Sequence, residues 1–79
     1  MTDEDELARL RADVVKVQRR WFEAEAFWVA EPEDPARYEA FAAVGLELHG
    51  HAFWQAAGGN RFERETSVRK DAREEQDGA

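Results

Sequence analysis

Apolar side chains recur every three or four residues along the first third of the chain. Residues 4–30 contain no proline or glycine, and seven positions follow the alternating spacing of three and four that is typical of helices packed along a seam. These positions are Leu7, Leu10, Val14, Val17, Trp21, Ala24 and Trp28. The pattern predicts one long helix over residues 4–30.

A second apolar line runs along the same predicted helix. Val15, Phe22 and Val29 stand seven residues apart, about 100° around the helix from the first line. One partner helix cannot easily cover both lines. The first helix therefore needs more than a single neighbour to bury its apolar surface.

The segment "EPEDP" at residues 31–35 ends this helix, because proline disfavours helical geometry in the residue before it. Asp34 followed by Pro35 is a typical N-cap and first-turn pair, so a second helix is predicted to begin there. Its apolar spacing continues to Gly58 and Gly59, which suit a left-handed C-cap. Leu46 and Phe53 lie on a second face of this helix.

Two helices of similar length joined by a short loop predict an antiparallel hairpin. A turn centred near Glu33 brings Trp28 close to Tyr38 and Trp21 close to Gly45. A large indole over a glycine fills space that no side chain occupies. We therefore expect the aromatic residues to close the turn end of the hairpin.

Residues 60–79 carry five bases and six acids, and their large apolar side chains are Phe62 and Val68. Asn60 and Glu63 resemble a capping box, which allows a helix over residues 61–75. So thin an apolar face predicts a weakly helical or disordered tail. The expected organisation is a helical hairpin domain over residues 1–59 and a charged C-terminal tail over residues 60–79.

The chain has 18 acidic and 11 basic residues and a formal net charge of −7, which repels phosphate backbones and anionic membranes at long range. The basic clusters "KVQRR" and "SVRKDAR" have acids nearby, so nucleic acid is an unlikely partner. No apolar run approaches the ~20 residues of a membrane span, and the chain starts without a signal-peptide pattern. We expect a cytoplasmic protein with no membrane contact. Nine arginines against two lysines favour a bacterial source.

The sequence offers little for catalysis or metal binding. It has no cysteine, its one serine is Ser67, and neither histidine has a recognisable triad partner. His49 and His51 are two positions apart, so on a helix they point about 200° from each other and cannot chelate one ion. We expect a partly buried His49, a solvent-facing His51, and no enzymatic activity, cofactor or metal.

The two apolar lines predict a contact surface. Phe27 and Trp54 fall off the main stripes, and either would mark such a surface if exposed. The residues assigned to the interaction surface are Val15, Phe22, Val29, Leu46, Phe53 and Trp54. The prediction is an all-α protein whose hairpin forms a four-helix bundle as a homodimer, or docks on another protein as a hetero-oligomer. The function expected is that of a small non-enzymatic interaction module, and the alternative is a DNA-associated regulator or accessory factor.

Overall fold

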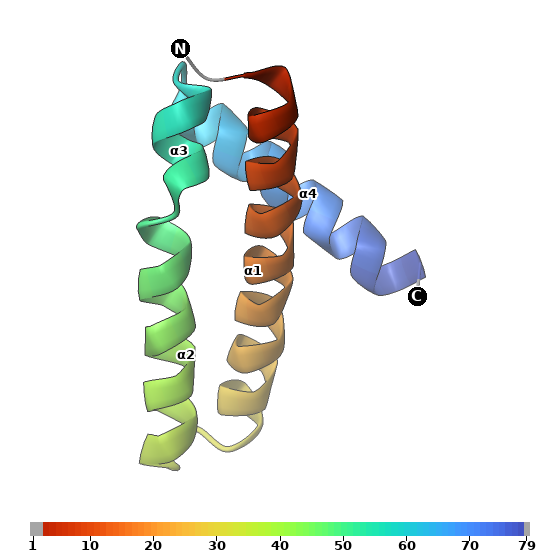
Figure 1. Cartoon of the computed structure of the whole chain (residues 1–79). Helices are drawn as coiled ribbons and strands as arrows, with labels where there is room; N and C mark the ends of the chain where they lie inside the picture. Colours follow the sequence, from red (N-terminus) through yellow and green to blue (C-terminus); the bar gives the residue numbers. More distant parts are fainter. Residues whose placement is uncertain (1–2, 79) are drawn as a thin grey trace.

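The computed structural model describes residues 3–78, which form four helices and no strand. They are α1 (Glu4–Ala30), α2 (Pro35–His49), α3 (Ala52–Ala57) and α4 (Arg61–Gly78). Helices α1 and α2 lie antiparallel, and α3 follows α2 beside the first turns of α1 (Figure 1). Helix α4 then crosses α1 obliquely. The all-helical class predicted from the sequence is confirmed.

Helix α1 has the predicted bounds, and its start is capped by a local acid. The Asp3 carboxylate accepts a hydrogen bond from the Asp5 amide at 3.1 Å. Acidic side chains in the first turn lie near the positive end of the helix dipole, which stabilises the helix. The sequence therefore fixes where α1 begins as well as where it ends.

The turn and its pairings also agree with the prediction. Asp34 caps α2 by accepting from the Ala36 amide at 2.9 Å, and Pro35 occupies the first turn. The Trp28 and Tyr38 ring centroids lie 5.5 Å apart. A Cβ atom built on Gly45 would lie 3.5 Å from Trp21 Nε1, so the indole does face the glycine.

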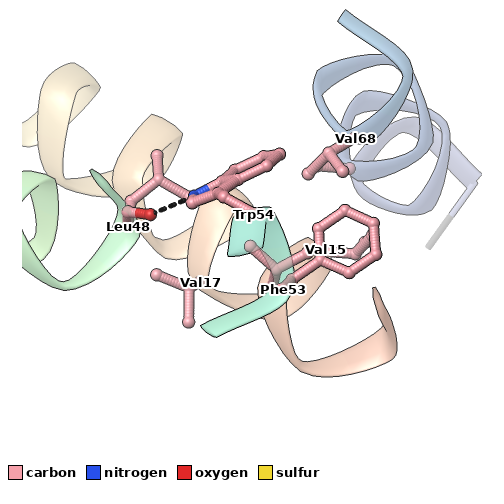
Figure 2. Close-up of a cluster of buried hydrophobic side chains, with 8 residues drawn as sticks. Val15, Val17, Leu48, Phe53, Trp54 and Val68 are labelled. Carbon is pink, nitrogen blue, oxygen red and sulfur yellow. Dashed lines mark hydrogen bonds between the residues drawn. The ribbon is translucent and has the colours of Figure 1, made fainter. Parts of the chain in front are cut away.

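The prediction of one continuous helix after the turn is wrong, because the chain breaks at Gly50. His51 caps the next helix: its Nδ1 accepts from the Phe53 amide at 3.0 Å. The Trp54 indole Nε1 donates to the Leu48 carbonyl at 2.6 Å (Figure 2). Glycine is a poor helix former, and these two bonds satisfy backbone groups that the break exposes.

The expectation of a weakly helical or disordered tail is also wrong, since α4 is a regular helix docked on α1. Val68 and Ala72 are fully buried because a spacing of four residues places them on one face of α4. Phe62, in contrast, is 74% exposed. Ion pairs from Arg11 and Arg19 of α1 to acids of α4 flank the contact. A buried alanine lets the two helices approach closely.

The core therefore draws on helices from both ends of the chain (Figure 2). Its buried apolar members are Val14, Val15, Val17, Leu48, Phe53, Trp54, Val68 and Ala72. Val15 packs within this cluster. Helix α4 therefore helps to bury a residue that was predicted from the sequence to contact a second protein molecule. Within residues 3–78, no helix is long and apolar enough to cross a membrane.

Candidate interaction surface

Three of the six residues predicted for the interaction surface lie inside the chain's own core. Val15 is 5% exposed, Phe53 is 1% exposed and Trp54 is 9% exposed. Figure 2 shows these side chains gathered around Val68 of α4. Half of the residues that were predicted to contact a partner are thus buried in the core of the same molecule.

The other three predicted residues lie nearer the turn. Phe22 is half-buried, Val29 is 61% exposed and Leu46 is 77% exposed. We call these three residues the distal face. On α1, Val15, Phe22 and Val29 follow one line, and exposure rises along it from buried Val15 through half-buried Phe22 to exposed Val29.

Helical geometry places Val29 and Leu46 on the same side of the hairpin. On the opposite side, Arg20 pairs with Glu47 at 3.1 Å, and the Arg37 guanidinium lies 3.8 Å from the centroid of the Phe27 ring. Val29 follows Arg20 by nine positions, and Leu46 follows Arg37 by nine positions. Nine residues rotate a helix by about two and a half turns, so the two side chains of each pair point in opposite directions. Val29 and Leu46 therefore both face away from these contacts, on the side where α4 crosses.

A chain of aromatic contacts supports the distal face from within the hairpin. Trp28 stacks on Phe41 at 5.1 Å between centroids with an interplanar angle of 19°. Phe41 also contacts Trp21 at 5.1 Å, and Trp21 contacts Phe22 edge-on at 5.6 Å. Such contacts between large planar side chains restrict their motion. The distal face is consequently a preformed surface rather than a loose end.

Arg37 holds the turn end of the hairpin together. Its Nη1 donates to the Phe27 carbonyl at 2.8 Å, one of the α1 carbonyls that has no partner inside the helix. Its Nη2 lies 2.9 Å from a Glu31 carboxylate oxygen, and its Nε lies 3.6 Å from Asp34. Phe27 remains 54% exposed under this guanidinium. Phe27 was predicted from the sequence as a possible contact residue, but in the structure its ring and its carbonyl both contact Arg37. We call this set of Arg37 contacts the clamp.

One edge of the distal face is basic. The Arg73 guanidinium of α4 lies 5.0 Å from the centroid of the Phe22 ring, so this side of α4 faces the distal face. Four residues separate Arg69 from Arg73, which places both on that side. Neither arginine forms an ion pair with any side chain that the structure describes.

The side of the distal face nearer the turn is acidic. Glu39 lies seven residues before Leu46 and so follows the same line of α2. Its carboxylate is exposed and has no basic partner among the described side chains. Glu25 lies between Phe22 and Val29 on α1. Sequence reasoning missed Glu39 and Arg73. The seven-residue spacing to Leu46 could have found Glu39, whereas only the α4 docking identifies Arg73.

The expected exposures of the two histidines are reversed. His49 is exposed, whereas the His51 side chain is 9% exposed. His51 Nε2 lies 2.6 Å from Asp13 Oδ2 while Nδ1 caps α3, so both ring nitrogens have structural partners. Among the described residues, no group of three or more His, Cys, Asp or Glu side chains is arranged to hold a metal ion.

Comparison of the chain with models of protein families, with curated proteins and with solved structures gives no match.

Proposed function

We propose that this chain is a non-enzymatic helical interaction module that binds a protein partner on its distal face. The observation that carries the proposal is the exposure of Val29 and Leu46 on one side of a hairpin whose interior is held by stacked aromatic rings. Exposed aliphatic side chains on one side of a rigid hairpin are candidates for a protein interface.

The way in which Val15 is covered within the chain indicates which kind of partner could cover the rest of this line on α1. At Val15 the line on α1 is covered by a helix, α4, which contributes Val68 and Ala72. Phe22 and Val29 continue this line with the same seven-residue spacing, which matches the spacing of anchors on an amphipathic helix. A helical partner is therefore the best fit for the distal face.

The nucleic-acid alternative has less support. In "KVQRR", Arg19 lies 3.8 Å from Glu75 and Arg20 lies 3.1 Å from Glu47, so both arginines already have acidic partners. Arg69, Lys70 and Arg73 form a smaller basic group on a chain whose net charge is −7. Such a charge balance disfavours strong binding to phosphate backbones.

A test in the source cells compares Leu46→Glu with Lys16→Glu. Both substitutions place a carboxylate at an exposed helical position, but Lys16 lies about 100° around α1 from Val15 and away from the distal face. In size-exclusion chromatography of cell extracts, the wild type and Lys16→Glu should elute in a complex larger than the 9.1 kDa chain. Leu46→Glu should elute as the free chain. A complex of unchanged size in Leu46→Glu would contradict the proposal.

A further inference from the structure

The His51 side chain joins two parts of the fold through its two ring nitrogens. Nδ1 accepts a hydrogen bond from the Phe53 amide at 3.0 Å, and Nε2 lies 2.6 Å from Asp13 Oδ2. The first bond caps α3, and the second reaches α1. The side chain is 9% exposed, so a bond lost at either nitrogen leaves a polar atom largely shielded from water.

These two bonds require one particular form of the imidazole ring. A backbone N–H only donates, so Nδ1 must carry a lone pair and no proton when it accepts from Phe53. The proton of the neutral ring therefore lies on Nε2, which donates it to the Asp13 carboxylate. The other neutral tautomer and the doubly protonated ring both carry a proton on Nδ1. Either form would set the Nδ1 proton against the Phe53 N–H, donor against donor.

The charged groups around His51 determine what happens when the ring gains a proton. Three charged side chains of α1 line the shallow cleft beside it, namely Glu6, Arg9 and Asp13. Helix α3 has no charged residue of its own. The turn before α3 is also contacted by α4, where Arg61 Nη2 donates to the carbonyl of His49, a residue whose side chain is exposed. With two acids and one base in the cleft, the imidazolium can keep its bond to Asp13, so the bond to Phe53 is the one that protonation removes.

Protonation of His51 should therefore remove the N-cap of α3 without detaching the ring from α1. Histidine is the side chain that ordinarily changes charge between about pH 5 and pH 8. An N-cap matters most to a short helix, and α3 has 6 residues. We propose that His51 is a pH-sensitive cap, which holds the first turn of α3 at neutral pH and releases it on acidification. Release of this turn loosens the segment that joins the α1–α2 hairpin to α4.

Nuclear magnetic resonance of the purified full-length chain tests the form of the ring first. Long-range proton–nitrogen correlation at about pH 8, where histidine is ordinarily neutral, should show the His51 proton on Nε2 and none on Nδ1. A proton on Nδ1 would overturn the proposal. This measurement uses the wild type, so it does not depend on whether a variant folds.

Acidification of the same sample tests the cap. Between about pH 8 and about pH 5, the Phe53 amide resonance should shift together with the ring resonances of His51. After correction for the intrinsic effect of pH, protection of the Phe53 amide from hydrogen exchange should fall by at least about fivefold, because its hydrogen-bond acceptor is lost. A Phe53 amide that keeps its resonance and its protection while the ring titrates would contradict the proposal.

His51→Asn separates titration from capping, because asparagine is a favoured N-cap residue whose side chain does not titrate. Protection of the Phe53 amide in this variant should change by less than about twofold over the same pH range. Asp13→Asn and His49→Asn are the matched controls: the first removes the charge that pairs with His51, and the second changes the exposed histidine. Both should keep the wild-type response at Phe53, and circular dichroism checks that each variant keeps its helices. A wild-type response in His51→Asn, or its loss in either control, would show that another group controls the cap.

Discussion

The two halves of helix α1 have the same apolar line but different surroundings. Val15, in the half that α4 crosses, is 5% exposed, whereas Val29, two seven-residue steps further along, is 61% exposed. The crossing angle of α4 takes it away from α1 before it reaches the turn (Figure 1). A heptad line in a sequence therefore identifies a surface that can be covered, while the path of the third helix decides how much of it is covered.

Different interactions hold the two halves together. The half near α4 has an apolar core in which Val14, Phe53 and Val68 are almost fully buried. The half near the turn has partly exposed stacked rings and the clamp formed by Arg37. Substitutions in the first half should accordingly cost more stability than substitutions in the second.

The largest effect is expected at Val68. Val68→Asp places a carboxylate at a position with 0% exposure, which should destabilise the fold by more than about 3 kcal/mol. Phe62→Asp on the same helix is the control: this side chain is 74% exposed, so the change should stay within about 0.5 kcal/mol. Urea denaturation followed by tryptophan fluorescence measures both. Equal effects would mean that α4 does not dock through Val68.

A smaller effect is expected from Arg37→Ala at the turn. This substitution removes the bond to the Phe27 carbonyl, the contact with the Phe27 ring and the pair with Glu31, and should cost about 1–2 kcal/mol. Arg20→Ala removes only an exposed pair with Glu47 and should cost less than about 1 kcal/mol. Thermal unfolding by circular dichroism compares them. If Arg37→Ala lowers the free energy of unfolding no more than Arg20→Ala does, the contacts of Arg37 do not hold the turn together.

The smallest effect is expected at Gly45, which lies between the two halves. It is the only substitution here that is expected to increase stability. A Cβ atom there would lie 3.5 Å from Trp21 Nε1, which is an ordinary van der Waals distance. Gly45→Ala should therefore stabilise α2 by about 0.5–1 kcal/mol through the better helix propensity of alanine. Gly45→Leu, which would collide with the indole, should destabilise it. A loss of stability with alanine would contradict this prediction, because it would mean that the Trp21 indole leaves no room for a methyl group at Gly45.

Local patterns predicted the hairpin well because local interactions determine it. The spacing from Leu7 to Trp28 predicted α1, and Asp34 with Pro35 predicted the start of α2. The pairing of Trp21 with Gly45 followed from the short turn alone. These features depend on neighbours within a few residues or on one loop of known length.

The features that sequence reasoning missed depend on distant partners. The break at Gly50 is stabilised by Trp54, whose indole bonds to Leu48, and by His51, whose ring also meets Asp13. The docking of α4 depends on Val68 and on Ala72, a residue too small to mark an apolar face. A glycine and a histidine inside an apolar pattern are the signals that could have indicated the break.

Because those distant contacts join two parts of the fold, we expect the two parts to open separately. The Trp54 indole bond to Leu48 ties α3, and with it the attached α4, to the end of α2. In hydrogen-exchange experiments, we expect the Trp54 indole proton to exchange at the same rate as the amides of α4 near Val68, because both side chains belong to one buried cluster. In the α1–α2 hairpin, the contacts of Trp21 and Trp28 do not involve α4. The slowest-exchanging amides of this hairpin should therefore stay protected from exchange during that opening. A single indole resonance would thus report the local opening equilibrium of the C-terminal third of the chain.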